Sequence, residues 1–574
     1  MVKFLIGLAT GVILVFLSFI LLFFALLRFR EQPPQMSANS VLLMRLQGEI
    51  PEKAPIELPE FLGGEERSSL TVSNVWLNLR KAAADSHIRA LVLEPEGLTA
   101  GWGKLEEIRS DVEEFRKSGK PVYAYLRNPS ARDYYVALPA DRIYLGPEDP
   151  LMLKGMRAEI MYFKKTLDKL GVTVYVEHAG KYKDFGDMFT RSDMSPETRD
   201  VTNSLVDDLY GNLVARIAAA RKKSPEDVTA LIDRGPFTAM QALNAGLVDE
   251  LRFEDQLWGE LRAALHFDPV KVSAATYSKV PMEAVGLQGR SHIALVIGEG
   301  DIVRGDPSDN GADENELTSY GFDRLLNQVA NDPLVKAAVV RIDSPGGEVT
   351  ASDDIWRQMT LLSKKKPLVI SMSDVAASGG YYMAMTGDPI VAYPGTMTGS
   401  IGVVFGKPDL HGLYDKLGIT KDAVQRGQHA DIDSDYTPLT PDEQALLRKG
   451  IDESYAEFIS KVAQGRHKQP ADIEPVAQGR VWLGSQAKQH GLVDQLGGLS
   501  AAIDLAKKRA NIPASEQVSL IVYPPKRSLI DLLTRRSHDD MLESRLAKVF
   551  GDVPFHAWMR GGMLRIMPQW VVVK

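Results

Sequence analysis

The chain contains 574 residues, of which 44% are hydrophobic and 25% are charged, proportions that exclude a disordered or fibrous protein. Its 67 basic and 75 acidic residues give a formal net charge of −8, so we expect no nucleic-acid partner. The chain has no cysteine, which excludes disulfides, thiolate metal sites and a cysteine nucleophile.

The first predicted element is a membrane anchor at Phe4–Leu27, a run without a charged residue. As a helix it would be about 36 Å long, enough to cross a hydrocarbon core of about 30 Å. The run lacks the small residues of a signal-peptide cleavage site, so we expect it to be retained. Lys3 precedes the run, and Arg28 and Arg30 follow it. Positive charges on the two sides are nearly balanced, so they do not determine the orientation of the anchor in the membrane.

The rest of the chain contains an internal duplication. The sequence Asp168-Lys169-Leu170-Gly171 recurs as Asp415-Lys416-Leu417-Gly418, which is an offset of 247 residues. Further matches at that offset are Tyr134-Tyr135 with Tyr381-Tyr382, Asp141 with Asp388, Pro147 with Pro394 and Gly180 with Gly427. Gly246-Leu247-Val248-Asp249 recurs as Gly491-Leu492-Val493-Asp494 at an offset of 245. An ordered series of this kind predicts two homologous domains.

Each copy has the pattern of an α/β domain. In the second copy, short apolar runs alternate with helical stretches at 320–331 and 352–364; the runs are 293–297, 337–340, 368–370 and 390–392. This alternation predicts a mostly parallel sheet covered by helices. We therefore expect repeats at 40–270 and 292–522, a linker near 271–290, and a C-terminal extension, 523–574, that packs on the body.

Two glycine-rich motifs of the second copy follow predicted strands. They are Asp343-Ser344-Pro345-Gly346-Gly347 and Ala376-Ala377-Ser378-Gly379-Gly380-Tyr381-Tyr382. Small residues let a backbone and a substrate approach closely, and a serine between a strand and a helix can sit on a sharp turn. The pattern alone fits equally well two glycine turns with Ser378 as a helix cap.

The duplication bears on this choice, because the first copy shows what the fold requires. The position of Ser378 is taken by Ala131 in the first copy, and the Ser344–Gly347 motif by Glu94-Pro95-Glu96-Gly97. Conversely, Lys183 of the first copy corresponds to Ala430 of the second. Each copy lacks what the other has, as expected if the two share one site.

At this point the motifs resemble the signal peptide peptidase A, or protease IV, family in its long, duplicated form. The matching stretches are Gly180-x-Tyr182-Lys183, Ser344-Pro345-Gly346-Gly347, Ala376-Ala377-Ser378-Gly379-Gly380-Tyr381 and Thr398-Gly399-Ser400-Ile401-Gly402, within a resemblance from about Ser40 to Ile521. The resemblance implies two tandem Clp/crotonase-like domains and a Ser–Lys dyad, with Ser378 as nucleophile and Lys183 as general base. It implies no cofactor and no metal.

The resemblance further implies cleavage of signal-peptide remnants by a homotetramer. This assembly would form a bowl on the periplasmic side of the bacterial inner membrane and contact lipid through the N-terminal anchor. An anchored protease meets apolar peptides first. An extended peptide could add as a strand beside the Gly-Gly loop, with an apolar pocket for its side chain at the cleavage site.

A serine is a weak nucleophile until a base removes its proton, and a lysine can be that base only when neutral. We therefore expect Lys183 to be buried against the second repeat, with Asp184 directed elsewhere. Following the family pattern, the N–H groups of Gly347 and Gly379 are the candidate oxyanion donors. Ser400 is expected to orient the lysine amine, or to be a turn serine.

Three alternatives remain open from the residues. A Clp-like triad would need a histidine about one strand after the nucleophile, but 394–402 contains none and His411 follows later. A membrane-tethered acyl-CoA enzyme of the crotonase type would need neither Ser378 nor Lys183. An inactive scaffold would have little reason to keep both.

Overall fold

The computed structural model describes residues 11, 14–18, 34–54, 70–305, 316–525, 563–567 and 572–573. Most of the predicted anchor, residues 4–27, lies outside these ranges, which include only residues 11 and 14–18 of it. Within them, the structure contains no helix with the length and apolar character needed to cross a bilayer.

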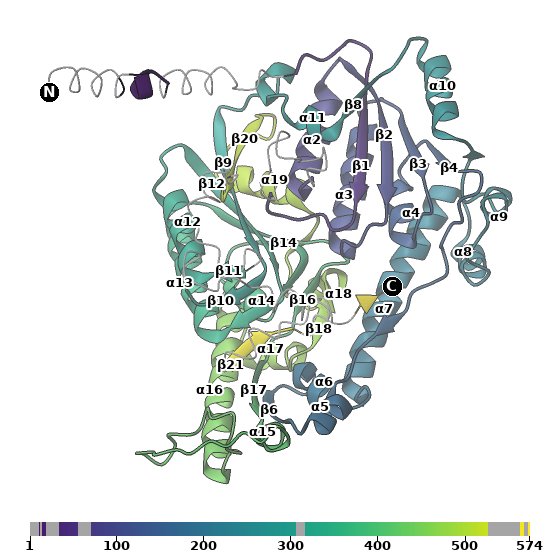
Figure 1. Ribbon diagram of the computed structural model, residues 1–574. Helices are drawn as coiled ribbons and strands as arrows, with labels where there is room; N and C mark the ends of the chain where they lie inside the picture. Colours follow the sequence, from purple (N-terminus) through teal and green to yellow (C-terminus); the bar gives the residue numbers. More distant parts are fainter. Residues whose placement is uncertain are drawn as a thin grey trace.

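A six-stranded parallel sheet forms the centre of the first repeat, drawn in purple and blue in Figure 1. From edge to edge its strands are β7 (Glu250–Leu251), β4 (Arg142–Leu145), β3 (Val122–Leu126), β2 (Ile88–Glu96), β1 (Ser40–Gln47) and β8 (Val270–Ser273). Along β1, Leu42 and Met44 enter one apolar core, while Val41 and Leu43 enter the core on the other face. Burial on both faces explains why these strands are apolar throughout.

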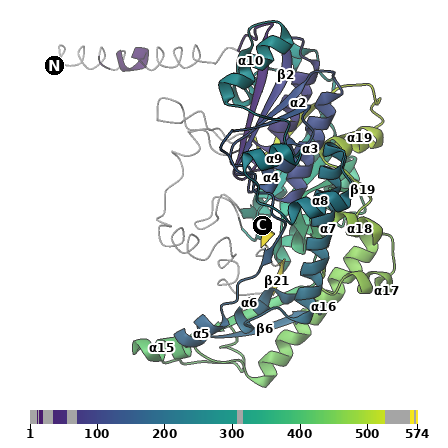
Figure 2. The ribbon, with the colours of Figure 1, turned by 90° about the vertical axis from the view of Figure 1, so that its right-hand side faces the viewer.

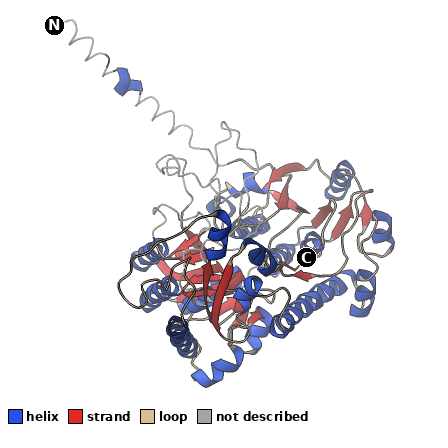
Figure 3. Ribbon diagram, turned by 60° about the horizontal axis from the view of Figure 1, so that its bottom comes forward, coloured by secondary structure: helices blue, strands red, loops and turns tan. Residues whose placement is uncertain are grey.

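Helices pack around this sheet. Figure 3, in which helices are blue and strands are red, shows helices around the strands throughout the molecule. Those of the first repeat are α2 (Val72–Ala84), α3 (Trp102–Arg116), α4 (Ala131–Ala137), α7 (Pro196–Arg221), α8 (Pro225–Ile232), α9 (Ala239–Asn244), α10 (Glu254–Leu265) and α11 (Ala274–Ser278). The expected linker, 271–290, differs from a simple connection: it contains part of β8, α11 and the 3₁₀ turn η3 (Met282–Val285). The buried Lys81 ammonium fixes this segment by donating to the carbonyls of Tyr277 and Val280.

The second repeat has an eight-stranded sheet of corresponding design. Its main path is β18 (Val481–Leu483), β16 (Met397–Gly399), β14 (Leu368–Ala377), β12 (Val335–Ser344), β9 (Ser291–Glu299) and β20 (Val518–Tyr523), and β14 also pairs with β15 (Ile390–Ala392), which pairs with β19 (Gln495–Leu496). Its helices are α12 (Ser319–Asn331), α13 (Val349–Lys365), α14 (Gly379–Met383), α16 (Pro441–Gly465), α17 (Pro470–Ile473), α18 (Gly484–Gln489) and α19 (Leu499–Arg509), with the 3₁₀ turn η4 (Glu474–Val476).

The strand order makes the duplication visible. The order β7-β4-β3-β2-β1-β8 of the first repeat matches β19-β15-β14-β12-β9-β20 of the second. Individual contacts recur as well: the Tyr134 hydroxyl donates to the Leu247 carbonyl, and the Tyr381 hydroxyl donates to the Leu492 carbonyl. The prediction of two homologous α/β domains is confirmed.

A third, mixed sheet combines strands from both repeats and from the extension. Its order is β11 (Glu316–Thr318), β10 (Asp301–Val303), β13 (Gly346–Glu348), β21 (Met563–Ile566), β17 (Val403–Asp409) and β6 (Thr173–Ala179). Near its β6 edge lie α5 (Lys164–Leu170), η2 (Asp184–Gly186), α6 (Asp187–Thr190) and α15 (His411–Leu417), at the end toward which α7 and α16 extend in Figure 2. A last pair joins β22 (Val572–Val573) to β5 (Ala158–Glu159).

Buried polar contacts hold the two repeats against each other. The Arg341 guanidinium of β12 contacts the carboxylates of Glu52 and Glu107 from the first repeat. The indole N–H of Trp76 on α2 donates to the Ser500 hydroxyl of α19 at 2.7 Å. The relative position of the repeats is therefore fixed by specific partners, and a site shared between them can be rigid.

Candidate active site

Ser378 lies on a strained turn between β14 and α14. Its backbone has φ 51° and ψ −112°, a conformation that is uncommon for a residue with a side chain. The corresponding helix of the first repeat, α4, begins with ordinary extended geometry at Ser130, φ −75°. The fold therefore does not require the strained turn. Strain at the end of a strand is the geometry that presents a nucleophilic serine in other hydrolases.

Lys183 reaches this turn because β6 of the first repeat pairs with β17 of the second repeat in the mixed sheet. β6 pairs antiparallel with β17 over its whole length, from Thr173 opposite Asp409 to Ala179 opposite Val403. The chain then turns at Gly180, and the Tyr182 N–H donates to the carbonyl of Gln478 in the second repeat. This strand exchange places the lysine within the neighbouring repeat.

The structure brings three of the predicted residues into direct contact. Lys183 Nζ lies 2.8 Å from Ser378 Oγ, 2.9 Å from Ser400 Oγ and 3.0 Å from the Ser400 carbonyl oxygen. All three residues are fully buried. A neutral amine has two N–H donors and one lone pair. It can donate to both oxygens of Ser400 and keep its lone pair for the Ser378 hydroxyl proton.

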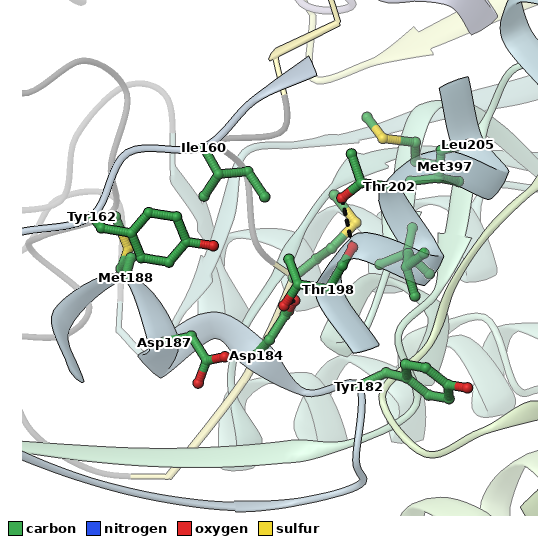
Figure 4. A pocket seen from close by; sticks show the side chains of 13 residues that line it. Ile160, Tyr162, Tyr182, Asp184, Asp187, Met188, Thr198, Thr202, Leu205 and Met397 are labelled. Atoms are coloured by element: carbon green, nitrogen blue, oxygen red, sulfur yellow. Dashed lines mark hydrogen bonds between the residues drawn. The ribbon is translucent and has the colours of Figure 1, made fainter. Parts of the chain in front are cut away.

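Burial favours this neutral form. It is the largest influence on the pKa of Lys183, which lies well below its ordinary value, and the nearby Arg565 guanidinium lowers the pKa further. The Asp184 carboxylate opposes this shift but turns away, since it accepts a hydrogen bond from Thr198 Oγ1 at 2.6 Å. Burial also raises the pKa of Asp184 itself to about 6. Figure 4 shows Asp184 beside Thr198 in a pocket that Tyr182 also lines.

The glycines of both motifs meet beside the serine. Gly379 follows Ser378 directly, and a β-carbon on Gly379 would lie 3.1 Å from Gly346 Cα. A β-carbon on Gly347 would lie 2.0 Å from the Ile302 carbonyl oxygen, so no larger residue fits there. Gly347 is part of β13 and Gly379 begins α14, and their role as oxyanion donors stays a prediction.

His411, the candidate for a Clp-like triad, is placed elsewhere. It begins α15 and stacks on the Tyr436 ring at a centroid distance of 4.4 Å. The described contact of the Ser378 hydroxyl is with Lys183 instead.

Sequence reasoning missed one participant, the strand β21. Its residue Arg565 is buried near the dyad, and Met567 contributes to the pocket of Figure 4. The only signal was the apolar character of the run after Gly562, which does not indicate where it packs.

Replacing Ser400 by alanine is expected to lower kcat/KM about tenfold, the cost of one side-chain hydrogen bond to the amine. The carbonyl of residue 400 would remain as the second acceptor, so the lysine would be less well oriented but still present. The measurement is a pH–rate profile of both proteins. A purely structural serine would lower the folding stability and leave the position of the acid limb unchanged, whereas loss of an amine partner would move that limb.

A family model and curated proteins both match this chain. The model of peptidase family S49 matches twice, over residues 114–267 and 360–513. The chain is 36% identical over 505 residues to a chloroplastic serine protease SPPA of Arabidopsis thaliana, covering 86% of this chain and 73% of that protein. It is 33% identical over 485 residues to Protease 4 of Salmonella typhi, covering 82% and 76%. It is 30% identical over 532 residues to Protease 4 of Haemophilus influenzae, covering 87% and 84%.

Proposed function

The chain belongs to peptidase family S49 and is a serine protease, and from this we propose that it is an endopeptidase with a Ser–Lys dyad acting on apolar peptides, remnants of signal peptides among them. The observation that carries the proposal is the buried contact of 2.8 Å between Lys183 Nζ and Ser378 Oγ. A buried lysine that forms no ion pair among the described residues, and that lies beside a strained serine, has the properties of a general base.

In the proposed reaction, the lone pair of Lys183 takes the proton of Ser378 while Oγ attacks the peptide carbonyl carbon. The negative charge that develops on the carbonyl oxygen is stabilised by the N–H groups of Gly347 and Gly379. The lysine ammonium then gives its proton to the leaving amine as the peptide bond breaks. Water, deprotonated by the same amine, hydrolyses the acyl-enzyme and restores Ser378.

We infer the setting of this reaction from the N-terminal sequence and from the family resemblance. The uncharged run Phe4–Leu27 supports a membrane anchor, which would bring the site close to apolar peptides. We place the body on the periplasmic side of a bacterial inner membrane, and a homotetramer and a Clp/crotonase-like fold are part of the same proposal. The parallel sheets with glycine loops after β12 and β14 support the fold assignment.

The test uses the full chain in detergent micelles. We expect the protein to cleave a quenched fluorescent peptide of leucine and alanine. Its kcat/KM should be at least about tenfold higher than for an equally long peptide of serine and asparagine, because the polar peptide buries no apolar side chains. A sulfonyl fluoride should stop turnover, and mass spectrometry should locate the adduct on Ser378. A folded chain that cleaves neither peptide, or that is labelled on another serine, would contradict the proposal.

A further inference from the structure

β21, a segment of the C-terminal extension, lies beside the glycine loop of the active site. It pairs antiparallel with β13, with Gly346 opposite Ile566 and Gly347 opposite Arg565. Its other edge pairs with β17, with Val404 opposite Leu564. This is the position in which the sequence predicts that a peptide substrate adds as a strand.

The backbone of the segment comes as close to the site as a bound peptide would. A β-carbon at Gly346 would lie 1.9 Å from the Arg565 carbonyl oxygen and 2.6 Å from the Gly379 nitrogen. Beyond the strand, the Met567 N–H donates to the Pro345 carbonyl at 2.9 Å. The loop that is expected to hold a substrate therefore holds this segment through its main chain.

The side chains of the segment fill pockets on both faces of the strand. Leu564 and Ile566 pack against a cluster formed by Phe185, Met188 and Phe189 of the first repeat. Met567 belongs to a second apolar cluster, which also contains Ala377, the residue before Ser378. These three side chains are at most 2% exposed. The groove thus accepts an extended peptide with apolar side chains at alternate positions.

Arg565 is the exception, and it makes the fit imperfect. Its guanidinium lies 3.7 Å from the centre of the Tyr382 ring and is 1% exposed. Its Nε has no hydrogen-bond partner among the described residues. Among the described residues no carboxylate pairs with this guanidinium, so its burial is offset only by the Tyr382 and Phe458 rings and by the Val349 carbonyl at 3.5 Å, and the docking of the strand is weaker than with an ion pair. Such a segment is suited to reversible occupation of the groove.

We propose that the groove between β13 and β17 is the substrate-binding site for extended apolar peptides, and that segment Met563–Met567 occupies it as an intramolecular competitor. The inference rests on the proposed function, since it assigns the substrate position of that site. A tethered peptide acts at an effective concentration of roughly millimolar, so weak intrinsic binding is enough for occupation. Substrate must displace the segment to reach Ser378.

A reversible disulfide lock tests this, and the chain suits it because it contains no cysteine. Phe405 and Met563 are direct partners across β17 and β21, and neighbouring Cα atoms of an antiparallel pair are within disulfide range. In the Phe405→Cys/Met563→Cys variant of the full chain, oxidation should lower turnover of the leucine–alanine peptide at least about tenfold. Reduction should restore it, and each single cysteine variant should be insensitive to oxidation.

A second variant, designed to release the segment from the groove, should raise the catalytic efficiency instead of lowering it. Leu564→Asp places a charge in the apolar cluster and should expel the strand, lowering KM about tenfold if the folded body is unchanged. Its control is Val424→Asp, the same kind of change at a side chain that is 87% exposed. A peptide of residues 561–570 should inhibit the release variant competitively.

The outcomes separate the two proposals. If the reduced double-cysteine variant and the wild type are both inert toward peptides, the proposed function fails. If they cleave peptides but the oxidised, cross-linked protein is equally active, the segment is not a competitor. Failure of the cysteines to cross-link in the folded, active protein would show that β21 does not occupy the groove, and would also overturn the inference.

Discussion

Replacing Ser378 by alanine, or Lys183 by methionine, is expected to lower kcat/KM by at least about 10³-fold, and combining both changes should cost little more. In the proposed mechanism the two side chains act in one proton transfer, so either loss would remove the whole step. Their contact of 2.8 Å is buried and pairs each group with the other. The measurement is turnover of the leucine–alanine peptide by the single and double variants. A double variant that is much worse than either single one would show that the two residues act independently.

The lysine variant should fold normally, and the sign of its effect on stability follows from the pKa. Burial holds the pKa of Lys183 well below its ordinary value of about 10.4. Between the lowered pKa of the folded chain and this ordinary value, the unfolded chain binds up to one more proton than the folded chain, so the stability of the wild type rises with pH in that window. Methionine removes this dependence and should leave Tm at pH 7 equal or higher.

Two controls isolate the role of the dyad. Lys407→Met removes another buried lysine whose pKa is lowered by burial, but which donates to the Thr437 carbonyl. Ser519→Ala removes a hydroxyl of β20 that donates to the Gly289 carbonyl. Both controls should keep most of the activity. If Lys183→Met retained activity while Ser378→Ala lost it, another group would be the base.

The duplication singles out Ser378 and Lys183 as candidates by an internal comparison, and the resemblance of the motifs to a known family implies their roles as a dyad. Ala131 in place of Ser378 and Ala430 in place of Lys183 show that neither residue is needed for folding. The structure adds how they meet, through the pairing of β6 with β17. That exchange joins residues more than 200 positions apart, and local patterns carry no information about such a partner.

The position of the C-terminal extension could not be predicted from the sequence either, because its partner strands are also distant in the chain. An apolar run near the end of a chain favours packing on the body but is also compatible with a subunit contact or with lipid, and it does not indicate which part of the body it contacts. Only the register of β21, with Gly347 opposite Arg565, reveals that it lies beside the nucleophile. The segment 271–290 is predicted to be a linker because its apolar pattern is weak. The structure shows that it contains α11 and contacts the buried Lys81.

The second large effect concerns the contact between the repeats. Arg341→Met should destabilise the protein by about 3–5 kcal/mol, because it leaves two buried carboxylates without their cation. The guanidinium lies 2.8 Å from Glu52 and 2.5 Å from Glu107, and all three side chains are at most 2% exposed. For repeats of this size we expect Tm to fall by roughly 10 °C.

The pH dependence of this loss has a definite sign. Without Arg341 the pKa of Glu52, now held below its ordinary value, should rise above that of the unfolded chain, and the pKa of Glu107, already raised by burial, should rise further, because burial then acts with less opposition. A carboxylate with a raised pKa destabilises the folded state above its unfolded pKa of about 4.3, and the penalty disappears as both states become protonated below it. The deficit in Tm should therefore be largest near neutral pH and shrink toward pH 4.

A compensating variant distinguishes charge imbalance from lost packing. Adding Glu52→Gln and Glu107→Gln to Arg341→Met removes the uncompensated charges and should recover most of the lost Tm. The activity should follow the same order, because Lys183 and Ser378 come from different repeats and depend on their relative position. If Arg341→Met left Tm unchanged near pH 7, the ion network would not be what holds the repeats together. The shared site would then depend mainly on the pairing of β6 with β17.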